Sequence, residues 1–159
     1  MPLLVVDIAD LAVSRDPDVT LVTYSLGSCI GVTIWDPAVR AGGMLHYMLP
    51  EASLSPEKAA SVPAMFCDTG VPRLFRALYE LGAAKNRLVV KVAGGSMLLD
   101  DRGTFNIGKR NYLALRKIFW KNGVMIDGED VGGSVSRTLR LAVASGEVTL
   151  KTRDREVPL

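Results

Sequence analysis

The sequence contains one histidine and two cysteines, and such low numbers argue against several kinds of protein. Cys29 and Cys67 form neither a CxxC motif nor, together with His46, a cluster with the spacing of metal ligands. Two cysteines are also too few for the disulfide framework of a small secreted domain. We therefore expect free thiols, no bound metal and no cofactor.

The sequence also lacks a large excess of charge of either sign and lacks long apolar runs. The 19 lysine and arginine residues nearly balance the 17 acidic ones, the net charge is +2, and no long basic run occurs. This balance gives no reason to expect nucleic acid as a partner. No apolar run approaches the roughly 18–20 residues of a transmembrane helix, and the first residues lack the features of a signal peptide. The sequence thus predicts a cytoplasmic protein without direct membrane insertion.

Length and composition are those of a folded domain. The chain has 159 residues, of which 48% are hydrophobic and 23% are charged. A chain of this size can bury a substantial core. We expect a single domain over residues 1–159, in which the polar stretch 152–159 forms a frayed tail.

Strand patterns outnumber helical patterns along the chain. Apolar residues recur at helical spacing in two stretches, which predicts helices at about residues 68–82 and 109–121. Runs rich in β-branched residues predict strands at residues 3–7, 19–24, 30–35, 44–49, 88–93, 124–126, 138–143 and 147–151. These elements are typical of an α+β fold, a β-rich sandwich in which helices pack on a mixed or antiparallel sheet.

The predicted strands 30–35 and 44–49 should form a β-hairpin. Asp36-Pro37 ends the first strand, which centres the turn near residues 38–39. Opposing residue numbers then sum to about 76–78, so Cys29 faces a residue near 47–49. Cys29 is therefore expected within diagonal reach of His46, the only histidine of the chain.

A thiol beside an imidazole suggests nucleophilic catalysis. A thiol becomes a good nucleophile when a base removes its proton, and histidine is the side chain best suited to that task near neutral pH. Gly27 permits a tight turn before Cys29, and the amides of Ser28 and Cys29 are candidates to bind an oxyanion. The alternative is that Cys29 is a small buried apolar residue and His46 a hydrogen-bonded core imidazole.

Other residues could complete or support such a site. Thr23, six residues before Cys29, could accept a hydrogen bond from the imidazole, although the residues alone favour an ordinary strand residue chosen for its β-propensity. Gly94, Gly95, Ser96 and Asn111 could line the site. The 94–96 stretch lacks the spacing of a nucleotide-binding loop, and its glycines favour close backbone approach instead. Cys67 has no histidine partner and is expected to be structural.

The motifs in their order resemble the CheD family, the chemoreceptor glutamine deamidases of bacterial and archaeal chemotaxis. The resemblance extends from about residue 3 to residue 151. The segments that carry it are Leu26-Gly27-Ser28-Cys29, Gly42-Gly43-Met44-Leu45-His46-Tyr47-Met48-Leu49-Pro50, Asp68-Thr69, Lys91-Val92-Ala93-Gly94-Gly95-Ser96-Met97, Asn106-Ile107-Gly108-Lys109-Arg110-Asn111 and Asp130-Val131-Gly132-Gly133. One departure is Val135-Ser136-Arg137, where the family often carries Gly-Arg.

The resemblance implies a specific reaction and specific partners. It implies a cysteine-hydrolase fold similar to deamidase toxins, with Cys29, His46 and Thr23 as the catalytic residues. The implied reaction converts receptor glutamine side chains to glutamate through a cysteine thioester. The implied partners are the cytoplasmic domains of methyl-accepting chemotaxis receptors and, in many members, the phosphatase CheC. The alternatives are a chemotaxis adaptor with little catalysis, and a cysteine peptidase or thioesterase with the same dyad.

Overall fold

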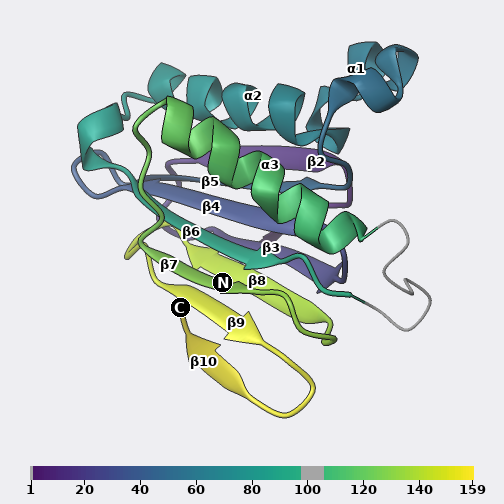
Figure 1. The fold of residues 1–159 in the computed structure, drawn as a ribbon. Coiled ribbons are helices and arrows are strands. Elements are labelled where there is room, and N and C mark those ends of the chain that lie inside the picture. Colours follow the sequence, from purple (N-terminus) through teal and green to yellow (C-terminus); the bar gives the residue numbers. More distant parts are fainter. Residues whose placement is uncertain (1, 98–105) are drawn as a thin grey trace.

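A computed structural model describes residues 2–97 and 106–159 of the chain. In these two segments, ten strands form two five-stranded sheets, and the long helices cover one of them. Figure 1 shows the resulting layers: α2 and α3 lie over the sheet that contains β5, β4 and β6, and the sheet with β8 and β9 lies on its other side. We call these the central sheet and the outer sheet. The α+β prediction is confirmed.

The outer sheet is built from both ends of the chain. Its strand order is β1-β3-β8-β9-β10, with β1 parallel to β3 and the other neighbours antiparallel. The strands are β1 (Leu3–Val5), β3 (Thr20–Leu26), β8 (Arg137–Ala142), β9 (Val148–Lys151) and β10 (Glu156–Pro158). The predicted hairpin of β8 and β9 is confirmed.

The predicted frayed tail at 152–159 is wrong, because β10 extends the outer sheet. Val157 pairs with Leu150 of β9, and the Leu159 amide donates to the Val148 carbonyl at 2.9 Å. Val157 also packs against the apolar cluster between the sheets. The polar sequence of the tail concealed this strand, since an edge strand needs few apolar residues when backbone hydrogen bonds hold it.

The central sheet contains the predicted hairpin. Its strand order is β2-β5-β4-β6-β7, and Gly31 lies opposite His46, so the pair sums to 77 as predicted. The strands are β2 (Asp10–Ser14), β5 (Ala41–Tyr47), β4 (Ile30–Asp36), β6 (Val89–Gly94) and β7 (Gly128–Val131). The prediction of a strand at residues 124–126 is wrong. The strand in this part of the chain is β7, which begins after Asp127.

The two predicted helices are confirmed and pack on the central sheet. They are α2 (Cys67–Glu80) and α3 (Ile107–Lys121); a short helix α1 (Pro56–Ser61) and 3₁₀ turns at Ala52–Leu54, Pro63–Met65 and Lys85–Arg87 complete the set seen in the described segments. Leu74 and Leu78 of α2 and Leu115 and Phe119 of α3 are buried in the helix-side core. None of the helices in the described residues combines the length and apolarity needed to cross a bilayer.

Alternation along β5 decides which residues face the outer sheet. Leu45 and Tyr47 belong to the core beneath the helices, whereas Met44 belongs to the core between the two sheets. Because successive strand residues point to opposite faces, His46 points the same way as Met44. The only imidazole of the chain therefore lies in the layer between the sheets.

Candidate active site

The 27–29 turn carries Cys29 from one sheet to the other. It joins β3 of the outer sheet to β4 of the central sheet. Each of its carbonyls accepts a hydrogen bond: Gly27 O from Ser96 N (2.8 Å), Ser28 O from Asn111 Nδ2 (2.9 Å) and Cys29 O from Gly95 N (2.9 Å). In the described residues, no backbone carbonyl accepts from the Ser28 or Cys29 amide. The Ser28 and Cys29 N–H groups therefore remain candidates to bind a developing oxyanion, as the sequence predicts.

Gly94 packs directly against this turn. Its φ is +115°, and a Cβ at this position would lie 2.2 Å from the Cys29 carbonyl oxygen. A side chain here would push the turn away, so glycine is required by close approach as well as by conformation. The glycine pair at 94–95 thus packs against the Cys29 backbone. This agrees with the prediction that these glycines allow close backbone approach and do not bind a nucleotide.

Thr23 faces the interior because it follows buried Leu21 by two residues in β3, and a bulge then brings Leu26 to the interior as well. Thr23 pairs with Leu139 and Leu26 pairs with Arg137, so β3 holds one extra residue between these pairs. Ser25 takes up the irregularity with a φ of 57°. Because of this extra residue, both Thr23 and Leu26 are fully buried although three positions separate them. Thr23 consequently meets His46 across the gap between the sheets.

Thr23 determines which nitrogen of His46 carries the proton. Its Oγ1 lies 2.6 Å from the Val6 carbonyl oxygen and 2.7 Å from His46 Nδ1. A carbonyl only accepts, so the hydroxyl proton points to Val6 and the hydroxyl oxygen accepts from Nδ1–H. Nε2 is then the unprotonated nitrogen, and it is buried without a hydrogen-bond partner in the described residues. It is available as a base.

Cys29 lies on the same face of the central sheet as His46. Gly31 is directly opposite His46, and Cys29 precedes Gly31 by two residues, which is the period of a strand. Cys29 packs against the apolar cluster between the sheets, as this alternation requires. The predicted hairpin register is therefore confirmed, and it places Cys29 on the sheet face of His46, two residues from the position opposite it.

Burial keeps both groups neutral in the resting enzyme. Burial raises the pKa of the Cys29 thiol to about 11, although a hydrogen bond with its own backbone opposes the shift. Burial also lowers the pKa of His46 to about 4, against the opposing charge of Asp7. At neutral pH the site therefore holds a neutral thiol and a neutral imidazole rather than an ion pair. Such a pair transfers its proton as the sulfur attacks.

The buried imidazole should make stability depend on pH. Above pH 6.5 His46 is neutral in both folded and unfolded chains; between pH 6.5 and 4 only the unfolded chain binds the proton, so stability falls on acidification. From pH 7 to pH 5 we expect wild type to lose about 2 kcal/mol more unfolding free energy than His46→Gln. Urea unfolding at both pH values measures this difference. Equal losses in the two proteins would contradict the assignment of a buried neutral imidazole.

Replacing Thr23 by valine should remove the hydrogen bond to the imidazole without leaving a cavity in the core. The variant keeps the side-chain volume but leaves Nδ1–H and the Val6 carbonyl unpaired, so we expect kcat to fall about 100-fold. Thr23→Ser retains the hydroxyl and should keep kcat within about tenfold of wild type. Steady-state kinetics measure both effects, and ¹⁵N chemical shifts of the imidazole report the tautomer. Similar losses in both variants would show that the hydroxyl is not responsible.

Asn111 ties the turn to the end of β5. Its Nδ2 donates to Ser28 O at 2.9 Å and to Met48 O at 2.8 Å, and the Tyr47 hydroxyl donates to its backbone carbonyl at 2.6 Å. These bonds connect the segment before Cys29 with the segment after His46. Asn111 and Ser96 are fully buried, so they hold the turn from behind rather than line an open site.

Cys67 lies apart from His46, in the core beneath the helices. It is fully buried at the start of α2, and burial raises the pKa of its thiol to about 12, a shift that a hydrogen bond with Tyr47 opposes. His46 points to the other face of the central sheet. The structure therefore separates Cys67 from the imidazole, in agreement with its predicted structural role.

Two contributors to this arrangement escaped the sequence reasoning. The Val6 carbonyl orients Thr23, and Arg137 contacts Ser96 and Gly94 behind the turn. Both depend on contacts between segments far apart in sequence, and no periodicity signals them. Within residues 2–97 and 106–159, no group of three or more His, Cys, Asp or Glu side chains is placed to hold a metal ion.

Comparison with known proteins gives consistent matches. The family model for CheD, described as CheD chemotactic sensory transduction, matches residues 48–152. "Probable chemoreceptor glutamine deamidase CheD 1" of Syntrophus aciditrophicus is 53% identical over 148 residues, covering 93% of this chain and 92% of the relative. "Probable chemoreceptor glutamine deamidase CheD 2" of Anaeromyxobacter dehalogenans is 50% identical over the whole of both chains. The matched range and these full-length identities establish that the chain belongs to the CheD family.

Proposed function

We propose that this chain hydrolyses glutamine side-chain amides of chemotaxis receptors to glutamate and releases ammonia. The observation that carries the proposal is His46 Nε2, a buried nitrogen without a partner in the described residues, on the same sheet face as Cys29. Thr23 holds the other nitrogen of the ring at 2.7 Å. The names of the relatives, which are chemoreceptor glutamine deamidases, support this reaction over other cysteine hydrolases.

In the first step, Cys29 attacks the amide carbon of the glutamine side chain. His46 Nε2 takes the thiol proton as the carbon–sulfur bond forms, because the neutral thiol is a weak nucleophile. Negative charge develops on the amide oxygen, and the Ser28 and Cys29 N–H groups stabilise it. Gly27 gives the turn the freedom to present these two donors.

In the second step, His46 returns the proton to the amide nitrogen. The carbon–nitrogen bond breaks, ammonia leaves, and a thioester to Cys29 remains. His46 then takes a proton from water as the water oxygen attacks the thioester carbon. The carbon–sulfur bond breaks, the proton passes from the imidazole to the sulfur, and the product is a glutamate side chain.

The proposed function includes a substrate, a cellular compartment and a partner. The substrates are cytoplasmic domains of methyl-accepting receptors, where each reaction turns a neutral amide into a carboxylate. We propose that the chain works in the cytoplasm as a single domain over residues 1–159, and that CheC is a partner that modulates it. The shared core between the two sheets supports the single domain.

Incubation with purified receptor cytoplasmic domains tests the proposal. Mass spectrometry should find peptides whose glutamines gain about one dalton, because an amide nitrogen is replaced by oxygen. Cys29→Ala serves as the matched control and should leave the peptides unchanged. Binding without any mass change would favour a receptor adaptor. Cleavage of the receptor chain would instead favour a peptidase.

A further inference from the structure

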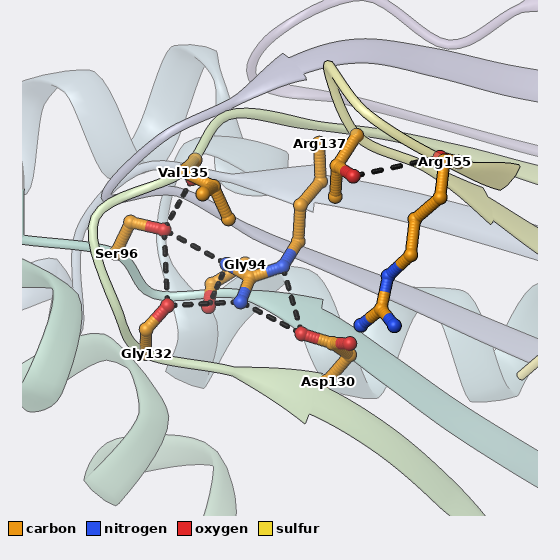
Figure 2. Close-up of polar contacts among 8 residues, drawn as sticks. Gly94, Ser96, Asp130, Gly132, Val135, Arg137 and Arg155 are labelled. Atoms are coloured by element: carbon orange, nitrogen blue, oxygen red, sulfur yellow. Dashed lines mark hydrogen bonds and ion pairs between the residues drawn. The ribbon is translucent and has the colours of Figure 1, made fainter. Parts of the chain in front are cut away.

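Arg137 is a nearly buried cation whose donors are all in use. It begins β8 and is 4% exposed. Its five hydrogen bonds are Nε to Asp130 Oδ1 (3.0 Å), Nη2 to Asp130 Oδ1 (2.7 Å) and to Gly132 O (2.9 Å), and Nη1 to Ser96 Oγ (2.8 Å) and to Gly94 O (3.3 Å). Figure 2 shows the guanidinium between Asp130 and Ser96. A guanidinium held in this way fixes the geometry of its partners.

The side chain of Arg137 crosses between the two sheets. Its backbone pairs with Leu26 in the outer sheet, whereas Gly94 and Asp130 belong to β6 and β7 of the central sheet. The 27–29 turn, which follows Leu26 directly, makes the same crossing from β3 to β4. Arg137 therefore sets the distance between the sheets at the end where Cys29 lies.

Arg137 is connected to Cys29 through residues 94–96. The Ser96 hydroxyl accepts from Arg137 and donates to the Val135 carbonyl at 2.6 Å. The Ser96 amide in turn donates to the Gly27 carbonyl, and the Gly95 amide donates to the Cys29 carbonyl. Arg137 thus contacts residues 94–96, and these residues in turn hydrogen-bond to the turn that presents the thiol.

We propose that Arg137 is a positioning residue for Cys29. It holds residues 94–96 against the 27–29 turn, and this contact keeps the thiol in place beside His46. Arg137 touches neither the sulfur nor the imidazole, so it acts through the turn alone. The inference rests on the proposed function in one respect only: the effect of the thiol position on kcat requires that the chain is a deamidase.

Substitution of Arg137 by methionine removes the donors but keeps much of the side-chain length. We expect kcat on receptor domains to fall about 10–100-fold, because a small displacement of a reacting group is enough for such a loss. KM should change less than about threefold, because Arg137 is buried behind the turn and binds no substrate. Ser96→Ala, which removes one contact only, should lower kcat in the same direction by a smaller factor.

Arg87→Met is the matched control. Arg87 pairs with Asp36, whose side chain is fully buried, at 2.9 Å. Asp36 is the last residue of β4, at the opposite end from Cys29. This substitution also breaks an ion pair to a buried strand, so it should lower the urea midpoint while leaving kcat close to wild type.

Alkylation with iodoacetamide separates a local effect from general loss of stability. Cys29 and Cys67 are both free, and global unfolding exposes both thiols. In Arg137→Met we expect faster alkylation of Cys29 while Cys67 remains protected, measured by peptide mass spectrometry. This readout needs no receptor, so it decides the role of Arg137 even if the chain deamidates nothing.

Two results would overturn the proposal. One is a kcat for Arg137→Met that equals the kcat of Arg87→Met at matched stability. The other is alkylation of Cys29 and Cys67 that rises in parallel. If Arg137→Met does not fold, Ser96→Ala provides the same comparison, and unchanged kcat and Cys29 alkylation in that variant would contradict the proposal.

Discussion

Replacing Cys29 by alanine is expected to abolish deamidation, with kcat lowered by about 10⁴-fold or more. The reaction needs a nucleophile at this position, and no other thiol lies on the same sheet face as His46 in the described residues. Receptor binding should persist, since alanine leaves the surrounding turn intact. The measurement is the rate of mass gain at receptor glutamines under single-turnover conditions.

Cys67→Ala is the control that makes the Cys29 result specific. Cys67 is also buried, so its loss removes a thiol of the same size from a core. It lies in the core on the helix side of the central sheet, whereas His46 faces the other side, and activity should stay within about twofold of wild type when the protein is folded. Equal losses in the two variants would mean that the nucleophile is assigned wrongly.

Loss of the imidazole should have the second-largest effect. In His46→Ala the thiol, with its pKa raised to about 11 by burial, has no base, so it remains protonated at neutral pH. General acid–base catalysis by a placed side chain contributes about 10²–10⁴-fold, and we expect kcat to fall at least that far. Steady-state kinetics with the receptor domain measure the loss, and KM should change little.

The pH profile of His46→Ala distinguishes a lost base from a disturbed fold. Without the imidazole, the residual rate should rise with pH toward the thiol pKa near 11, because hydroxide must supply the thiolate. Wild type should instead stay active well below pH 6.5, since its imidazole titrates near pH 4. A residual rate that is independent of pH would contradict the role of His46 as the base. His46→Gln, which preserves more volume, controls for packing.

Local sequence patterns were sufficient to predict the hairpin and its register. Asp36-Pro37 ends one strand and the apolar run after it begins the next, so the turn centre follows from the numbering alone. The structure bears this out, with Gly31 opposite His46. The catalytic roles of Cys29, His46 and Thr23 remain predictions that the variants above test.

The placement of Thr23 shows where sequence reasoning reaches its limit. Threonine is common in strands, and the residues alone favoured an ordinary strand role for it over a catalytic one. Thr23 follows buried Leu21 by two residues and so faces the interior, and the pairing of β3 with β1 places the Val6 carbonyl beside its hydroxyl. The contact with Val6 joins residues that are 17 positions apart, and no periodicity in the sequence signals it.

Sequence by itself determined the α+β class, the two long helices, and the hairpin register that puts Cys29 and His46 on one sheet face, because each depends on short-range patterns or on one turn. Tertiary structure alone decided the two-sheet layering, the strand formed by the C-terminal tail, the imidazole tautomer and the contact of Arg137 with Ser96. These features arise from burial and hydrogen bonds between segments that lie far apart in the chain. Such contacts become visible only when the sheets are packed together.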